Sequence, residues 1–289
     1  MLKEKLIVHN GTEANNKQSC CVCICSRLDS ERLTFIFELI QSIINQKRKA
    51  DLILLVLSGY PYKKLEQRKN KLVKQLKKIK NIDKTNIAFL YSSKKGVSAA
   101  RNIAADVVKQ DILIFSDDDD IWAKDKLQLT CEVIENSNVP VLIRHGFHTL
   151  INGKSVKARE IYFNKVNLNI GLISNYYGGG STIAANTSLF KNIRFNESLI
   201  FGEDWDFWLR ADQAEIPIHT IKKSLVKYRY HNNRKTNSLL TNYKAELYIR
   251  RKITIQAINM IFFSSIGILK SSISLIITFA KNLMGVNRF

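Results

Sequence analysis

Four consecutive aspartates, Asp117 to Asp120, follow the apolar run Ile112 to Phe115 and come shortly before Trp122. In an extended backbone Asp117 and Asp119 point to the same side, because side chains alternate along a strand. Aspartates also favour turns, so a solvated turn is the alternative. The apolar run before the acids reads as a buried strand, and the tryptophan after them does not suit a loop tip. The pattern therefore favours a site for a hard divalent cation, which takes oxygen ligands.

The overall charge is opposite in sign to this acidic run. The chain has 289 residues and a formal net charge of +20, from 45 Lys and Arg against 25 Asp and Glu. Such an excess predicts an anionic partner, which could be a nucleic acid, a membrane surface or a phosphorylated substrate. The first residues contain no apolar segment typical of a signal peptide, and five cysteines, an odd number, suit a reducing compartment.

Four of the five cysteines crowd into residues 20–25. Cys20 and Cys23 have a spacing found in zinc sites, but no second pair of this kind exists and Cys131 stands alone. Cys21, Cys23 and Cys25 alternate with apolar residues, and free cysteine behaves as a small buried hydrophobe. The interpretation favoured here is therefore a buried strand.

Strand and helix signals alternate through the first half of the chain. Apolar runs predict strands over 21–25, 52–57, 86–91 and 111–115, and helical spacing predicts helices over 32–46, 62–81 and 96–109. This alternation predicts a parallel sheet with helices on its faces. Right-handed crossovers place the carboxyl ends of all these strands at one edge. Four segments should therefore converge on one site: 26–27, 58–60, 92–96 and 117–120.

The second half has a different pattern. Asn152-Gly153 lies between alternating segments and predicts a hairpin, and residues 176–190 are rich in glycine and then apolar. Residues 202–214 predict a helix with acids in its first turn, where the helix dipole favours the ionised form. Residues 219–231 read as a strand.

The tail from Ile253 to Met284 is the most apolar segment of the chain. Its uncharged stretch, 253–269, falls just short of a membrane-spanning helix and contains polar residues. A narrow polar stripe recurs at helical spacing: Gly267, Lys270, Ser274, Thr278 and Lys281. Such a helix can lie in the membrane interface, which is the interpretation preferred here. The alternative is a helix packed on the catalytic domain or on a second copy.

Four segments, in order, carry a resemblance to a known family. They are GVSAARNIA at 96–104, ILIFSDDDDIW at 112–122, RFNESLIFGEDWDFWLRA at 194–211 and YRYHNNRKTNSL at 228–239. Over about residues 20 to 235 the chain resembles the family 2 glycosyltransferases. The resemblance implies an α/β, GT-A fold, Rossmann-like with a mostly parallel central sheet, followed by C-terminal amphipathic helices. It also implies inverting transfer of a sugar from a nucleotide-sugar donor.

The resemblance assigns roles to individual residues. Asp119 is expected to bind the metal, Mn²⁺ or Mg²⁺, and Asp117 to bind the metal or the ribose. His231 is expected at the metal or the diphosphate. A metal ion acts as a Lewis acid on the leaving diphosphate. Asp204 is expected to be the base that activates the acceptor hydroxyl, with Glu203 as the alternative.

The nucleotide side of the site is expected to include Ser26, Arg27, Arg101 and Asp118. For Arg101 a structural salt bridge remains an alternative. One departure from the family concerns the segment after the second strand, where an aspartate usually reads the nucleotide base. Here that place holds 58–61, Ser-Gly-Tyr-Pro, and no carboxylate. The base is therefore not predicted.

We expect three regions: an extension over 1–19, a glycosyltransferase domain over 20–240, and membrane-associating helices over 241–289. The domain divides into a nucleotide-sugar half, 20–122, and an acceptor half, 123–240. Expected partners are the donor, a glycan or lipid-linked acceptor and an anionic membrane surface, with no nucleic acid. The expected location is the cytoplasmic face of the cell membrane. A sugar nucleotidyltransferase and a non-enzymatic basic protein binding membrane or nucleic acid are the alternatives.

Overall fold

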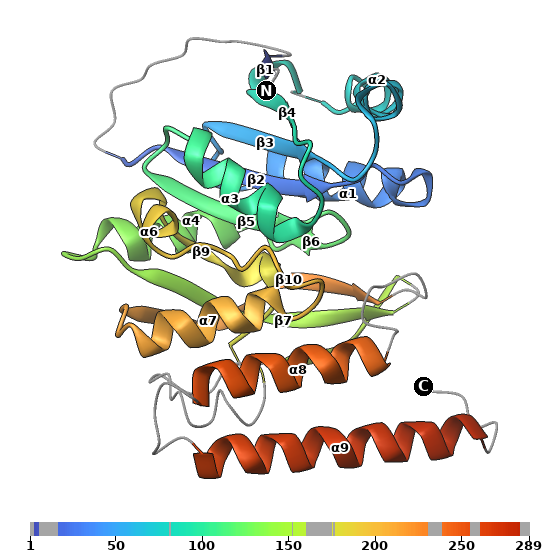
Figure 1. Ribbon diagram of the computed structural model, residues 1–289. Helices are drawn as coiled ribbons and strands as arrows, with labels where there is room; N and C mark the ends of the chain where they lie inside the picture. The colour runs from blue at the N-terminus through green and yellow to red at the C-terminus, as the bar shows by residue number, and fades with distance from the viewer. Residues whose placement is uncertain are drawn as a thin grey trace.

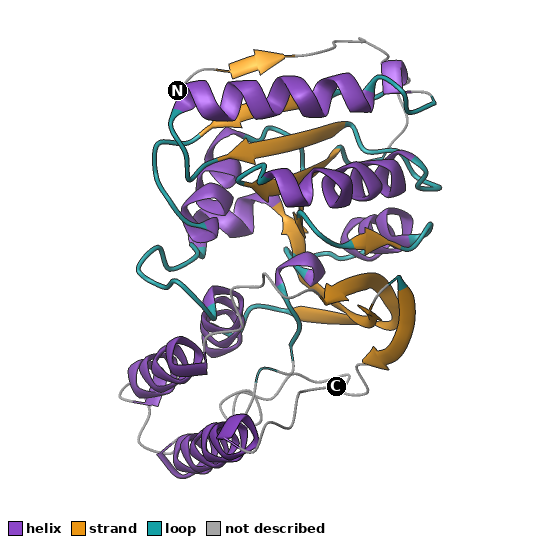
Figure 2. Ribbon diagram, turned by 90° about the vertical axis from the view of Figure 1, so that its right-hand side faces the viewer, coloured by secondary structure: helices purple, strands orange, loops and turns teal. Residues whose placement is uncertain are grey.

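The computed structural model describes residues 3–5, 17–80, 82–151, 153–159, 175, 177–230, 239–254 and 261–283. Ten strands of these residues form one curled sheet, and helices cover it (Figure 1). Turned by 90°, the molecule shows helices on both sides of the upper strands (Figure 2). The predicted α/β class with a mostly parallel central sheet is confirmed.

The first half of the chain forms the parallel part of the sheet, in the order β4-β3-β2-β5. The strands are β2 (Cys20–Ser26), β3 (Leu52–Leu57), β4 (Ile87–Tyr91) and β5 (Ile112–Asp117). The helices between them are α1 (Leu33–Ile44), α2 (Tyr62–Leu76) and α3 (Val97–Val107). A short strand, β1 (Lys3–Lys5), pairs antiparallel with β4. The strands β2 to β5 and the three helices match the apolar runs and helical spacings of the sequence, whereas β1, in the expected extension over 1–19, was not predicted.

The central strand β2 is buried on both faces, which explains its cysteines. Cys20 belongs to the core under α1, α2 and α4 (Lys126–Glu135), whereas Cys21 and Cys23 belong to the core under α3 and α7 (Glu203–Gln213). Cys20 and Cys23 therefore lie on opposite faces of the sheet and cannot share a metal ion. This agrees with the interpretation as a buried strand.

The second half extends the same sheet with antiparallel and parallel pairs. Its strands are β6 (Ile121–Trp122), β7 (Leu142–Ile151), β8 (Lys154–Arg159), β9 (Ala184–Asn186) and β10 (Ile218–Tyr230). β9 pairs antiparallel with both β5 and β7, so it joins the two halves. β10 runs parallel to β7 and carries β6 on its other side. The predicted hairpin forms between β7 and β8. The helix α4 and the short strands β6 and β9 were not predicted.

Three helices lie one after another in space beyond this half of the sheet. Figure 1 shows α7, then α8 (Leu239–Thr254), then α9 (Ile261–Leu283) as the outermost element. α6 (Thr187–Asn192) is a short helix that follows β9. Within the part of the chain that the structure describes, no helix has the length and hydropathy needed to cross a membrane.

Candidate active site

The carboxyl ends of the four parallel strands meet at one edge, as expected. The backbone N–H of Ser58 donates to the carbonyl of Ser26 (3.1 Å), and that of Ser92 donates to the carbonyl of Leu57 (2.8 Å). β5 ends beside β2 at Asp117. In open α/β sheets this edge is where ligands bind. The four acids therefore lie at the edge of the sheet where a ligand is expected to bind.

Arg101 joins the acidic run to helix α7. Its guanidinium is buried, with 2% of the side chain exposed, and lies 2.9 Å from Asp117 Oδ1 and 3.2 Å from Glu203 Oε1. Burial raises the pKa of Asp117, and the Arg101 charge opposes that rise. The structural salt bridge that the sequence left open is thus present, and it fixes the two halves of the site to each other.

Arg32 supplies the second positive charge, and sequence reasoning missed it. It lies in a 3-10 turn, Ser30–Arg32, and its guanidinium is 2.5 Å from Asp118 Oδ1 and 3.6 Å from Asp119 Oδ2. The hydroxyl of Ser26 donates to the other Asp118 oxygen (2.6 Å). Burial nevertheless raises the pKa of Asp118 to about 6. The sequence indicated only that the four adjacent aspartates need cations nearby, and it did not indicate which residues supply them.

Arg229, from the end of β10, holds the last two acids. Its backbone N–H donates to Asp120 Oδ1 (3.2 Å), and its Nε–H donates to the carbonyl of Asp119 (2.9 Å). Its guanidinium also pairs with Glu38 and lies over the ring of Phe35, both on α1. Arg229 belongs to the YRYH segment, which carries part of the family resemblance. Its contacts with the acidic run were not predicted from the sequence.

Lys126 provides a buried positive charge behind the acidic run. Its ammonium donates to the carbonyl of Ser181 (2.5 Å) and lies 3.9 Å from the centre of the Trp122 ring. Burial lowers the pKa of Lys126 to about 7, whereas the charges of Asp120 and Asp117 act to raise it. Burial also raises the pKa of Asp120 well above its usual value. Trp122, at the end of the motif, is therefore packed under a cation.

Asp204 lies in the first turn of α7, in a partly exposed position. Its Oδ1 accepts the backbone N–H of Trp205 (2.7 Å). Burial, followed by the charge of Glu203, raises the pKa of Asp204 to about 7. The expectation that the helix start favours the ionised form is therefore outweighed, because the loss of solvation is the larger effect here. A carboxyl group with this pKa can accept a proton near neutral pH.

Two glycines separate the acidic run from Asp204. A methyl group on Gly180 would lie 2.9 Å from Asp117 Oδ1 and 2.0 Å from Arg101 Nη2. A methyl group on the preceding Gly179 would lie 3.7 Å from Asp204 Oδ2. Adjacent Cα atoms are about 3.8 Å apart, so the two carboxylates flank one short stretch of bare backbone. The glycine-rich segment of the sequence thus brings Asp117 and Asp204 into one site.

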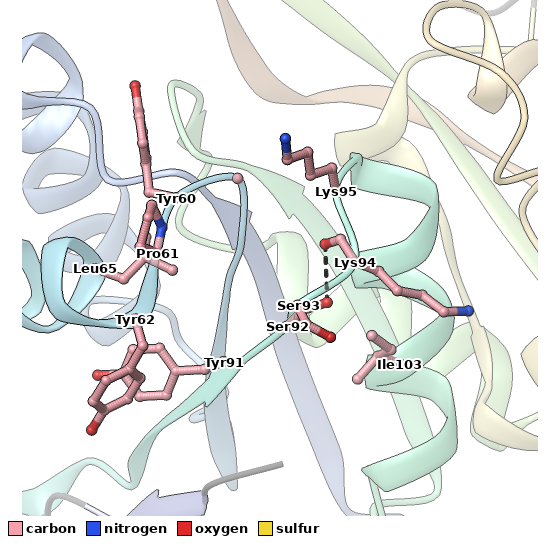
Figure 3. Close-up of a pocket in the computed structure, with 11 residues that line it drawn as sticks. Tyr60, Pro61, Tyr62, Leu65, Tyr91, Ser92, Ser93, Lys94, Lys95 and Ile103 are labelled. Carbon is pink, nitrogen blue, oxygen red and sulfur yellow. Dashed lines mark hydrogen bonds between the residues drawn. The ribbon is translucent and has the colours of Figure 1, made fainter.

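A cavity of about 700 Å³ lies between the ends of β3 and β4 and the start of α3 (Figure 3). Its lining includes Tyr62, Tyr91, Ser93 and Lys95, and no Asp or Glu is among the described lining residues. This agrees with the missing carboxylate noted in the sequence. Figure 3 shows the Tyr60 side chain directed away from Tyr62 and Tyr91, whose rings meet edge to face with their centres 4.7 Å apart.

Arg27 lies beside this cavity, and its contacts are with Tyr60 and Asp29 instead of with the acidic run 117–120. Its guanidinium donates to the hydroxyl of Tyr60 (2.8 Å) and is 3.6 Å from Asp29. Lys64 and Arg68 also lie over the Tyr60 ring, 4.1 Å and 4.3 Å from its centre. Three cations therefore surround one tyrosine at the end of β3.

The acidic residues fit a metal ion that takes its other ligands from a substrate. Asp117 and Asp119 are close enough for the charge of each to affect the other, and 30% and 12% of their side chains are exposed. Mg²⁺ typically binds one or two carboxylates together with substrate phosphates. In the described part of the chain no group of three or more potential ligands could hold an ion alone. His231 lies outside the described residues.

Comparison with sequence families gives a match that covers more than half of the chain. The sequence model of "Glycosyl transferase family 2" matches residues 19–194. This range includes β2 to β5, the acidic run and the two glycines, and it ends before Asp204.

Several proteins of known sequence are similar. An uncharacterized glycosyltransferase of Methanocaldococcus jannaschii is 26% identical over 74% of this chain and 71% of its own. The Escherichia coli UDP-Glc:alpha-D-GlcNAc-diphosphoundecaprenol beta-1,3-glucosyltransferase WfgD is 28% identical over 40% of this chain and 44% of its own. The Erwinia amylovora amylovoran biosynthesis glycosyltransferase AmsB is 27% identical over 48% of each. The match thus spans less than half of the last two.

Among solved structures, S. aureus TarS has the same fold. Its complex with UDP-GlcNAc superposes with a TM-score of 0.62 and 18% identity, over 89% of this chain and 73% of that chain. Its complex with UDP gives a TM-score of 0.57 and 20% identity, over 82% and 65%.

The contacts of Gly180 generate a prediction. Gly180→Ala should lower the free energy of unfolding by ~1–3 kcal/mol, the usual cost of an overpacked side chain, because Arg101 is buried and cannot move away. Urea denaturation measures this. Gly179→Ala is the matched control, because its methyl group meets only ordinary contacts at 3.7 and 3.8 Å. Equal stability of the two variants would contradict the packing described here.

Proposed function

This chain belongs to glycosyl transferase family 2, and on that premise we propose that it transfers a sugar from a nucleotide-sugar donor to a hydroxyl acceptor with inversion. Family membership makes the chain a glycosyltransferase, which supports this reading over a sugar nucleotidyltransferase or a non-enzymatic binding protein. The finer assignments below, of metal, base, acceptor and location, are parts of the proposal.

The observation that carries the proposal is the pair of carboxylates on the two sides of Gly179 and Gly180. Asp117 lies at the end of the parallel half of the sheet, and Asp204 starts a helix of the second half. An inverting transfer needs the leaving diphosphate on one face of the sugar and the base on the other. In this proposal the sugar ring lies between these two groups, over Gly179, where a methyl group would meet only ordinary contacts.

The leaving-group side would be held by the acidic run. Asp119, with Asp117, would hold a divalent cation, Mn²⁺ or Mg²⁺, together with oxygens of the diphosphate. When bound, the cation supplies Lewis-acid stabilisation of the negative charge that grows on the leaving phosphate. Asp117 is the more exposed of the two, which supports a contact with the ribose as its alternative role. His231 is kept as a proposed contact of the metal or the diphosphate.

On the opposite side Asp204 would act as the general base. Its carboxylate takes the proton of the acceptor hydroxyl as that oxygen forms its bond to the anomeric carbon and the bond to the diphosphate breaks. Trp205 orients Asp204 through its backbone N–H, and the pKa near 7 suits a base at neutral pH. Glu203, beside it, is held by Arg101 and is therefore the weaker candidate.

The nucleotide would lie along the ends of β2 to β4. Ser26 and Asp118 bond each other there, Arg27 lies next to the cavity, and Arg101 stands behind Asp117. The cavity of about 700 Å³ would take the base, which would meet hydroxyl and ammonium donors instead of a carboxylate. UDP and UDP-GlcNAc in the TarS complexes support a uridine diphosphate sugar as the first donor to test.

The acceptor is proposed to be a lipid-linked or growing surface glycan. WfgD by its name acts on a diphosphoundecaprenol-linked sugar, and AmsB takes part in amylovoran biosynthesis. A net charge of +20 suits an anionic membrane surface, where such an acceptor is found. We accordingly place the enzyme at the cytoplasmic face of the cell membrane.

The metal role predicts the effect of removing one ligand charge. Asp119→Asn keeps the shape of the side chain and should lower transfer by more than the ~10–100-fold that loss of an outer-shell partner costs. Transfer by the wild type should stop in excess EDTA and return when Mn²⁺ is added. A variant that transfers at the wild-type rate in EDTA would rule out the metal role.

The base role predicts both a rate and a pH profile. Asp204→Asn should lower transfer to the acceptor by ~10²–10⁴-fold, whereas calorimetry should find donor binding retained. The base acts as the carboxylate, so the wild-type rate should fall as the pH drops below about 7, the raised pKa of Asp204. This fall should be absent in the variant.

Glu203→Gln is the matched control, since it changes the neighbouring carboxylate without changing its size. It should retain much more activity than Asp204→Asn. If Glu203→Gln is inactive and Asp204→Asn transfers normally, the base is Glu203. If Asp204→Asn instead loses donor binding, Asp204 is a binding residue.

A further inference from the structure

The outermost helix, α9, exposes apolar side chains on the side that faces away from the protein. Ile266, Leu269, Ile273, Ile276 and Ile277 are between 37% and 66% exposed. At 3.6 residues per turn these five positions fall on one face, here named the α9 stripe. Contiguous exposed apolar surface usually marks an interaction site.

Two serines of α9 face inward and bond to α8, on the side of the helix away from the α9 stripe. The hydroxyl of Ser271 donates to Glu246 on α8, and the hydroxyl of Ser272 bonds that of Tyr243 (3.0 Å). Gly267 is buried, and Lys270 and Ser274 are exposed along the edge of the α9 stripe. Gly267, Lys270 and Ser274 thus lie between the contact with α8 and the α9 stripe, and the exposed apolar side is available to a partner outside the chain.

An anionic bilayer fits the α9 stripe better than a second copy of the chain. Lys270 lies on α9 beside Leu269, and Arg251 is exposed on α8. These charges, within a chain of net charge +20, attract anionic headgroups and repel another copy. An apolar face with a cation at its edge, as Lys270 is here, is the pattern of a helix that lies in the membrane interface.

A series of direct contacts runs from α9 to Asp204. Glu246 accepts from Ser271 and also pairs with the buried Arg250 (2.8 Å). The guanidinium of Arg250 lies 4.6 Å from the centre of the Trp205 ring. The N–H of Trp205 in turn holds Asp204 (2.7 Å). Every step in this series is a packed or hydrogen-bonded contact.

α8 also covers the start of α7. Gly202, which precedes α7, has a φ of +77°, and a methyl group there would lie 2.9 Å from Ile249 Cδ1. The first turn of α7 is therefore shaped by α8 on one side and by Arg101 on the other. Anything that orders α8 should also order this turn.

We propose that the α9 stripe docks on an anionic lipid bilayer and that docking steadies the first turn of α7 through Glu246, Arg250 and Trp205. A bilayer that binds this arrangement of α8 and α9 raises its population, as any ligand does for the state it prefers. Resting on the proposed role of Asp204, the inference predicts that transfer is faster on the membrane.

Docking is tested by sedimentation with phosphatidylcholine vesicles, with and without phosphatidylglycerol. The full chain should sediment only with the anionic vesicles, and the double variant Leu269→Glu, Ile276→Glu should not. Val139→Glu is the matched control, because Val139 is an exposed apolar residue far along the chain from α9. If Val139→Glu abolishes sedimentation equally, or if the full chain never sediments, the proposal is wrong.

Size-exclusion chromatography without vesicles tests the other occupant. If the full chain is a dimer and the double variant a monomer, the α9 stripe is an interface between copies and the bilayer proposal fails.

Coupling is tested by hydrogen exchange of residues 202–208, which needs no sugar donor. Anionic vesicles should slow exchange there on the order of tenfold, within the range typical of coupled sites. Glu246→Gln keeps the side-chain shape but weakens the pairing with Arg250. This variant should still sediment with anionic vesicles. Adding the vesicles, however, should hardly slow hydrogen exchange of its residues 202–208. Unchanged exchange in the wild type would refute the coupling. Because this readout is independent of transfer, a normal rate for Asp204→Asn would refute the proposed base alone.

Discussion

Four adjacent carboxylates can share one loop only if positive charge surrounds them, and the architecture of this site follows from that constraint. The compensating cations come from separate elements: Arg32 after β2, Arg101 on α3 and Lys126 on α4. Arg229 on β10 adds hydrogen bonds to Asp120 and to the backbone of Asp119. Each of these elements is therefore tied to the acidic run. A charge buried without a partner is far more costly than a paired one, so the pairing is also a condition for the fold.

The four aspartates differ in how far they are buried and bonded to the protein. Asp118 and Asp120 are buried and bonded to the protein, which fixes the shape of the acidic run. Asp117 is 30% exposed, and Gly180 beside it admits no side chain because a methyl group there would collide with Arg101. In the account given above, a substrate would enter at Asp117, with Asp204 across the glycine backbone. The strand β9 makes this possible, because its antiparallel pairing joins the half of the sheet with the acidic run to the half that carries Asp204.

The sequence predicts the parallel half of the fold well, since its strands are short apolar runs and its helices have a regular apolar spacing. The carboxyl-end rule then places 26–27, 58–60, 92–96 and 117–120 together. The short strands β6 and β9 have only two and three residues and leave no periodic signal. Arg32 and Lys126 could not be predicted, because their partners are fixed by tertiary packing and not by spacing. The pKa of Asp204 was expected to follow the helix dipole, but burial dominates, and burial is a property of the whole fold.

The central claim is that protein cations neutralise the acidic run in the free enzyme, so that a metal ion binds there only together with a diphosphate. Calorimetric titration of Mn²⁺ tests this directly, with the enzyme alone and then in the presence of each common nucleoside diphosphate. The account predicts weak binding of Mn²⁺ alone and much tighter binding with one of the nucleotides, lost in Asp119→Asn. Tight Mn²⁺ binding without nucleotide, or nucleotide binding that is unchanged by EDTA, would contradict it.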